Sequence, residues 1–138
     1  MIDECERLEQ IQQIIDELRD RSLCGAVVLV EGRRDREALE LLGVRGEIVT
    51  TSHRQLLSLA EELARAGAEV IILSDWDDRG DEVARQVQIY LEADGIKPDL
   101  RIRDSIKGLV RKEIKDVESL YNYMERLRRT CASKPQHY

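Results

Sequence analysis

Two short apolar runs, each followed at once by acidic residues, restrict the fold of this chain more than any other feature. Residues 26–30 lead into E-G-R-R-D at 31–35, and residues 70–73 lead into S-D-W-D-D-R-G at 74–80. Unbroken runs of β-branched residues are typical of strands that are buried on both faces, as in parallel sheets. Open α/β sheets bind their ligands beyond the carboxyl ends of the strands. We therefore expect both acidic segments to lie at one ligand-binding edge.

Strands and helices alternate along the rest of the chain. The spacing of apolar residues predicts helices at about 3–22 (amphipathic), 34–42, 54–66, 81–95 and 116–129, and strands at 26–31, 48–50, 70–73 and 99–103. Residues 130–138 show no periodicity and are predicted to form a disordered tail. A length of 138 residues predicts one α/β domain over residues 1–138.

The residue types of the strands also predict their order. Helical crossovers between successive strands imply a four-stranded parallel sheet. The two purely apolar strands should be central, and the short strand 48–50 and the alternating strand 99–103 should be edges, which gives the order 2-1-3-4. The winding direction then reverses between strands 1 and 3, and this switch point is where such folds bind ligands. Glu31, Asp75 and Asp77 would lie there.

The charges are unevenly distributed along the chain. A net charge of −6 argues against bulk affinity for nucleic acid. However, basic residues accompany the first acidic segment and the predicted fourth strand. We expect five of them to bind nucleic acid: Arg33, Arg34, Arg101, Arg103 and Lys107. The alternative is a solvated charged face, with cations that favour helix carboxyl termini.

Several other features predict ordinary structural roles. The sequence has no membrane-length apolar stretch and no signal peptide, so we expect a cytoplasmic protein with no membrane partner. Cys5, Cys24 and Cys131 are widely separated and odd in number, and we expect reduced thiols. Ser52 is expected to cap the following helix, which makes His53 a first-turn residue.

Glu31, Asp75 and Asp77 are the candidate metal ligands. Carboxylate oxygens with no histidine or cysteine beside them favour Mg²⁺ or Mn²⁺ over zinc. Several carboxylates in one crevice repel each other unless a cation lies between them. A carboxylate in such a cluster should have a raised pKa, which suits general acid or base catalysis.

Neighbouring residues would support this site. Gly80 allows the loop to turn into a helix whose first N–H groups face an anion, and Gly32 allows close approach of a phosphate. Asp77 or Asp78 has a simpler alternative role, because an aspartate before a helix is most often its N-cap.

The two acidic segments together resemble the hallmarks of the Toprim domain. This domain occurs in bacterial-type primases, type IA and type II topoisomerases, OLD-family nucleases, recombination-repair proteins and the ribonucleases that mature 5S ribosomal RNA. V-E-G-R-R-D at 30–35 and D-W-D-D-R-G at 75–80 resemble the forms in primases and maturation nucleases, and K-D-V-E at 115–118 resembles a segment of the nuclease branch. The resemblance covers a core at 24–118 and implies a Rossmann-like Toprim fold.

The resemblance also implies roles for individual residues. Glu31 would be the general acid/base in phosphoryl transfer, and Asp75 and Asp77 would hold Mg²⁺. Trp76, between the aspartates, would either stack on a base or shield the loop. The supporting residues would be Gly32, Asp35, Asp78, Gly80 and Asp116.

Three functional hypotheses of different classes follow. The first is Mg²⁺-dependent chemistry on nucleic-acid phosphodiesters, by a nuclease of the RNA-maturation type that acts alone or with a protein partner, or by primase-like nucleotidyl transfer. The second is a non-catalytic nucleic-acid-binding module. The third is a receiver-like phosphoacceptor domain, although the chain has no fifth strand that ends in a lysine. The sequence contains no zinc module, ATPase or tyrosine-bearing domain, which favours a small stand-alone Toprim protein.

Overall fold

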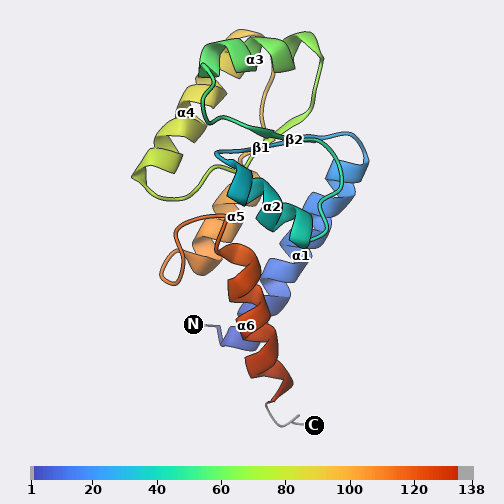
Figure 1. Cartoon of the computed structure of the whole chain (residues 1–138), viewed down its shortest axis with the longest axis vertical. Helices are drawn as coiled ribbons and strands as arrows, with labels where there is room; N and C mark the ends of the chain where they lie inside the picture. The colour runs from blue at the N-terminus through green and yellow to red at the C-terminus, as the bar shows by residue number, and fades with distance from the viewer. Residues whose placement is uncertain (1, 134–138) are drawn as a thin grey trace.

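The computed structural model describes residues 2–133, in which helices surround a small central sheet (Figure 1). In chain order the elements are α1 (Glu4–Leu23), β1 (Val27–Val30), α2 (Arg33–Leu41), β2 (Ile48–Thr50), α3 (Leu56–Arg65), β3 (Val70–Ile72), α4 (Asp78–Ala93), α5 (Arg101–Val110) and α6 (Leu120–Ala132). None of the helices in this described part is long and apolar enough to cross a membrane.

The sheet is parallel, with the order β2-β1-β3. Val28 of β1 pairs with Ile48 on one side and with Ile71 on the other. Every residue of β1 and β3 is buried, as expected for strands covered on both faces. The reversal of winding between β1 and β3 is therefore present as predicted.

Each face of the sheet is covered by its own set of helices. Val28, Val30 and Ile71 face a core built with α1, α2, α5 and α6. Val27, Leu29 and neighbouring apolar residues face a second core built with α3 and α4. In Figure 1, α3 and α4 lie above the sheet and the other helices lie below it. The carboxyl edge of the sheet opens between these two layers.

The prediction of a fourth strand at 99–103 is wrong for the described structure. Asp99 forms a single parallel bridge with Ile71, and α5 begins at Arg101. The Asp99 carboxylate accepts a hydrogen bond from the Arg101 N–H at 2.6 Å, and such local bonds favour a turn over an extended chain. Ile102 and Ile106 are both fully buried on one helical face. The alternation of apolar and basic residues at 99–103, which predicted a strand, belongs to the first turn of this amphipathic helix.

Three smaller predictions also need correction. Cys5 and Cys131 form a disulfide that joins α1 to α6, which lie side by side in Figure 1, and Cys24 is the free cysteine. Residues 130–132 belong to α6 instead of a disordered tail, and residues 134–138 lie outside the described part. Gln55 is the N-cap of α3 without a side-chain cap bond, so the proposed Ser52 cap is absent.

Candidate functional site

Glu31 and Asp75 meet at the carboxyl ends of β1 and β3. The backbone N–H of Asp75 donates a hydrogen bond to the Glu31 Oε2 atom at 2.8 Å, across the switch point. The bond uses one carboxylate oxygen of Glu31 and fixes that side chain against the loop that carries Asp75. The two residues are thus held together by a direct contact between strands that are 44 residues apart in sequence.

The segment 74–80, here called the aspartate loop, is closed on itself by two hydrogen bonds. The Ser74 hydroxyl donates to the Gly80 carbonyl at 2.7 Å, and the Gly80 N–H donates to the Asp77 carboxylate at 2.7 Å. Asp77 is therefore the N-cap of α4. A Cβ atom on residue 80 would overlap the Asp75 carbonyl, so the loop requires glycine there. Asp78 is exposed in the first turn of α4.

The carboxylate of Asp75 is the most perturbed group of the site. Its Oδ1 atom accepts a hydrogen bond from the Val117 N–H at 2.9 Å. Burial raises the pKa of Asp75, and the Val117 bond opposes that shift. The charges of Asp35, Glu31 and Asp116 raise it further, to about 7. A bound cation would lower the pKa of Asp75 again, because it stabilises the ionised carboxylate.

Asp35 and Asp116 lie around this carboxylate. Asp35 is buried, and its Oδ2 atom accepts a hydrogen bond from the Gly32 N–H at 3.0 Å, which closes the first turn of α2. Burial raises the pKa of Asp35, against the Gly32 bond, and the Glu31 charge adds to the rise. Asp116 accepts a hydrogen bond from the Ser119 N–H at 2.8 Å. Both carboxylates therefore contribute negative charge and also fix local backbone.

Trp76 does not reach a substrate in this structure. Its side chain is 3% exposed and packs in the core, and its indole N–H donates to the Ile114 carbonyl at 2.7 Å. Its backbone N–H also bonds to the Lys115 carbonyl. Of the two roles considered for Trp76, the shielding and anchoring of the aspartate loop fits, and stacking on an exposed base does not.

Arg103 is buried beneath the aspartate loop instead of lying at the surface. Its guanidinium donates to the carbonyls of Ser74 and Asp75 and to the Asp81 carboxylate at 2.6 Å. Lys107 bonds the same carboxylate at 3.1 Å, and both cations lower the pKa of Asp81. These contacts correct the expectation that Arg103 is free to contact nucleic acid.

The other predicted nucleic-acid contacts divide into two groups. Arg101 is exposed but pairs with Glu17 on α1, and it is the first residue of α5 instead of part of a strand. Arg33 and Arg34 lie at the amino end of α2, beside Glu31, and their side chains are about three-quarters exposed. They form exposed ion pairs at 3.5 Å, Arg33 with Glu37 and Arg34 with Glu118. Contact of Arg33 and Arg34 with nucleic acid stays a prediction.

Comparison with known proteins agrees with this geometry. The Toprim domain matches residues 26–106. The chain belongs to the Toprim domain family. Membership in this family indicates a metal-dependent function related to nucleic acids.

Relatives of this Toprim protein occur in archaea. The UPF0292 protein Mbar_A0484 of Methanosarcina barkeri is 45% identical over 88% of this chain and 85% of its own length. The UPF0292 protein PYRAB04740 of Pyrococcus abyssi is 42% identical over 85% of this chain and 86% of its own. A solved structure from Aquifex aeolicus has a TM-score of 0.67 and 27% identity, and it covers 78% of this chain and 94% of that chain. These names state no activity.

Toprim domains generally bind divalent metals such as Mg²⁺, and the donor set here fits such an ion. Glu31, Asp75 and Asp77 offer only carboxylate oxygens, and each uses one oxygen in the hydrogen bonds described above. Within residues 2–133, no group of three or more His, Cys, Asp or Glu side chains is already arranged to hold an ion. Magnesium usually binds through one or two carboxylates plus substrate phosphates.

A cavity that sequence reasoning missed opens beside Glu31 in this Toprim fold. It has a volume of about 440 Å³ and lies between the amino ends of α2 and α4 and the loop that follows β2. We call it the Glu31–His53 cavity, and it is lined by Glu31, Gly32, Asp35, Thr51, Ser52, His53, Arg54, Leu56, Arg79 and Val83. The chain must turn after β2, and this turn was the one sequence signal for the cavity. The apparent capping pattern at 52–55 instead predicted that His53 lies in the first turn of a helix.

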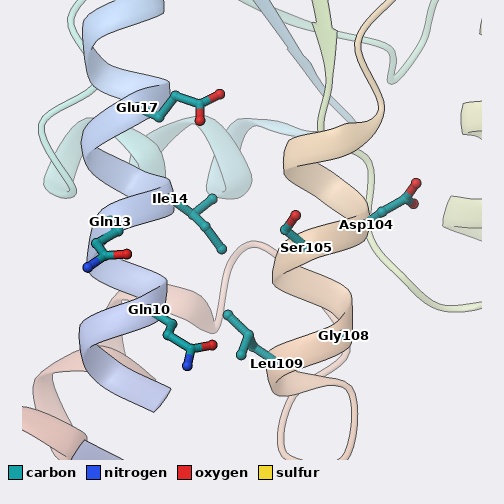
Figure 2. A pocket seen from close by; sticks show the side chains of 8 residues that line it. All are labelled: Gln10, Gln13, Ile14, Glu17, Asp104, Ser105, Gly108 and Leu109. Carbon is teal, nitrogen blue, oxygen red and sulfur yellow. The ribbon is translucent and has the colours of Figure 1, made fainter. Parts of the chain in front are cut away.

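A larger cavity, of about 690 Å³, lies elsewhere, between α1 and α5 (Figure 2). Figure 2 shows Glu17 and Gln10 from α1 opposite Asp104 and Leu109 from α5. None of the predicted site residues lines it. Size alone therefore does not identify the site in this protein.

Proposed function

We propose that this Toprim protein is a Mg²⁺-dependent nuclease of the RNA-maturation type, which cleaves nucleic-acid phosphodiester bonds. The observation that carries the proposal is the hydrogen bond from the Asp75 N–H to the Glu31 carboxylate at 2.8 Å. This bond holds Glu31, the proposed proton-transfer group, beside the proposed metal ligand Asp75 at the switch point of the sheet. Protein-derived carboxylates in that position are what phosphodiester hydrolysis with a hard cation requires.

The residues would divide the chemistry between them. Asp75 and Asp77 would hold Mg²⁺, which when bound would neutralise charge that develops on the phosphoryl group. Glu31 has one oxygen held by the Asp75 N–H, and its other oxygen would take a proton from the attacking water or give one to the leaving oxygen. Asp35 and Asp116 would keep the site strongly negative until the cation binds. Arg33 and Arg34 would attract the phosphate backbone.

A non-catalytic binding module is the second candidate. It is favoured by one observation, the lack of a preformed group of three metal-binding side chains within residues 2–133. In that case the carboxylates would grip a metal–phosphate unit, and a partner protein would supply the chemistry.

Conservative variants separate these functions. Glu31→Gln, Asp75→Asn and Asp77→Asn each keep an amide oxygen to accept the existing hydrogen bond, and asparagine caps helices as well as aspartate does. We expect each purified variant to melt as the wild type does at pH 4, before ionisation of Asp75 separates the stabilities of the wild type and the variant. Mg²⁺-dependent cleavage of structured RNA or DNA should be lost. Glu61→Gln, exposed on α3, is the control with the same chemical change.

Each outcome of that assay decides between the candidates. Products from the wild type and the control but not from the three variants would support the nuclease. Binding of nucleic acid without products, together with Mg²⁺ affinity that the Asp75→Asn/Asp77→Asn variant lacks, would support the binding module. Full activity of the Glu31→Gln variant would contradict the acid–base role.

A further inference from the structure

The Glu31–His53 cavity is open to solvent and directly adjoins the proposed catalytic carboxylate. Its volume of about 440 Å³ lies within the range of small-ligand sites, which begins at roughly 300 Å³. Glu31 lines this cavity, whereas Asp75 and Asp77 do not. Arg79, near the end of the aspartate loop, also lines it, so the cavity adjoins both Glu31 and the last turn of that loop. A substrate strand that crosses the metal site would reach it at a neighbouring nucleotide.

Three basic side chains border the cavity. Arg79 projects from the first turn of α4 and makes no ion pair with residues 2–133. Arg54 pairs with Glu62 at 2.6 Å, where both side chains are more than one-third exposed, so water competes for that pair. His53 lies between Arg54 and the hydroxyl side chain of Ser52. This set of donors suits an anion with several acceptor oxygens, such as a phosphate.

The loop after β2, which bears Ser52, His53 and Arg54, has an unusual backbone conformation. His53 has a φ of +61°, the one positive φ of a non-glycine residue in the described part of the chain. The N–H groups of Thr51 and Ser52 donate to the carbonyls of Val30 and Glu31 at 2.9 and 2.8 Å. These bonds extend the pairing of β1 and β2 by two residues. The chain leaves the direction of the strand at the next residue, His53. Backbone strain of this kind persists where the surroundings fix it, often at ligand sites.

Part of the cavity lining is apolar. Leu56 and Val83 form this part, and both are half-buried against the core formed with α3 and α4. The lining thus combines basic donors and aliphatic side chains beside the carboxylates of Glu31 and Asp35. This combination matches a ligand with a charged end and a flat, weakly polar body. Free phosphate would use only the first feature, whereas a nucleotide would use both.

We infer that the Glu31–His53 cavity binds one nucleotide of the substrate strand, next to the bond that is cleaved. Its phosphate lies against Arg79, Arg54 and His53, and its sugar or base lies against Leu56 and Val83. The inference rests on the proposed function, because it makes the cavity a subsite of the same nucleic acid. It assigns a substrate-positioning role to Arg79 and to His53 and Arg54, which lie outside the two acidic segments.

Binding in the absence of metal tests this subsite separately from catalysis. Fluorescein-labelled single-stranded RNA and DNA decamers of one sequence are titrated with the protein in EDTA, and binding is followed by anisotropy. Arg79→Gln should weaken binding by about tenfold, because a charge-assisted contact is lost. It should also reduce the slope of log affinity against log salt by about one. Arg85→Gln is the matched control, since Arg85 is an exposed arginine of the same helix that pairs with Glu82 outside the cavity.

Competition identifies the ligand. Adenosine 5′-monophosphate should displace the decamer from the wild type at a concentration where inorganic phosphate does not. Tighter binding of the RNA decamer would indicate that the cavity binds a ribonucleotide, and tighter binding of the DNA decamer would indicate a deoxyribonucleotide. Equal affinity of Arg79→Gln and Arg85→Gln, or equal competition by phosphate, would overturn it and leave the proposed nuclease untouched. A wild type that binds neither decamer, with or without Mg²⁺, would overturn the inference and the proposed function together.

Discussion

The two loops that flank Glu31 are built in opposite ways. The aspartate loop is fixed from below and from within by Arg103, Trp76 and the Ser74–Gly80 bond. The loop that follows β2, residues 51–55, is held by backbone hydrogen bonds at its start, and its side chains at 52–55 are exposed. One loop thus has buried side-chain supports, and the other presents its side chains to solvent.

This difference matches the demands of the two proposed roles. Metal ligands and proton-transfer groups must be positioned closely, and this requires support from surrounding side chains. A nucleotide subsite benefits from exposed side chains that can adjust to the ligand. Substitutions should therefore have large effects on stability in the aspartate loop and small effects in the loop after β2. The predictions below test that difference.

Replacement of Gly80 should have the largest effect. In Gly80→Ala the new methyl group would overlap the Asp75 carbonyl, and the loop would have to open. We expect the free energy of unfolding to fall by about 3 kcal/mol, at the upper end for overpacking. The measurement is urea denaturation followed by circular dichroism, with Mn²⁺ affinity as a second readout of loop geometry.

Gly108 provides the matched control for that change. It lies exposed in α5, and a Cβ atom there would meet nothing within 4 Å. Gly108→Ala should stabilise the protein by about 1 kcal/mol, because alanine favours helix over glycine. Equal effects of the two substitutions would mean that the close approach of Gly80 to Asp75 is unimportant.

Removal of the Arg103 side-chain charge should have the next largest effect. Arg103→Met leaves the buried carbonyls of Ser74 and Asp75 without these donors, and unsatisfied buried groups destabilise proteins. We expect a loss of about 2–3 kcal/mol in the free energy of unfolding. Arg101→Met, an exposed arginine two residues earlier, should change the free energy of unfolding by less than about 1 kcal/mol. A similar loss in both variants would contradict the supporting role of Arg103.

The pKa of Asp75 gives the aspartate loop a pH dependence. Its pKa is about 7 in the folded protein and near 4 in an unfolded chain. The stability that the neutral side chain contributes is complete below pH 4 and is lost as the pH rises through 7. Without metal, Asp75→Asn should therefore exceed the wild type in stability at pH 8, by on the order of 2 kcal/mol, and match it near pH 4.

Thermal melts between pH 4 and pH 8 measure this difference in stability between Asp75→Asn and the wild type. Addition of Mg²⁺ at pH 8 should stabilise the wild type and narrow the difference, because the ion favours the charged carboxylate. A stability difference that stays constant with pH would show that Asp75 has the same pKa in the folded and unfolded states.

Local sequence patterns were sufficient for the framework of the site. The runs at 26–30 and 70–73 predict buried parallel strands, and the residue that follows each strand is thereby placed at the carboxyl edge. Glu31 and Asp75 meet for this reason, through a contact that needs only strand order and direction. The sequence also predicted the N-cap role of Asp77 as an alternative to metal binding, because a cap bond joins residues only three positions apart.

Features that depend on distant parts of the chain could not be predicted in this way. The five residues 99–103 fit both a strand and the first turn of a helix, and the burial of Ile102 beneath the sheet decides between them. The Cys5–Cys131 disulfide depends on the antiparallel contact of two terminal helices. The Glu31–His53 cavity depends on the positive φ of His53, which histidine does not signal as glycine would.

His53 provides the smallest expected effect, and the clearest test of the exposed loop. Glycine adopts a φ of +61° without strain, but it also gains freedom in the unfolded chain, and these effects oppose each other. We expect His53→Gly to change the free energy of unfolding by less than about 1 kcal/mol. His53→Val should lower it by about 1–2 kcal/mol, since a β-branched residue is poorly accommodated at positive φ. If both variants were as damaging as Gly80→Ala, the loop after β2 would be as tightly supported as the aspartate loop. Equal stability of the glycine and valine variants would instead mean that residue 53 is free to leave the left-handed region.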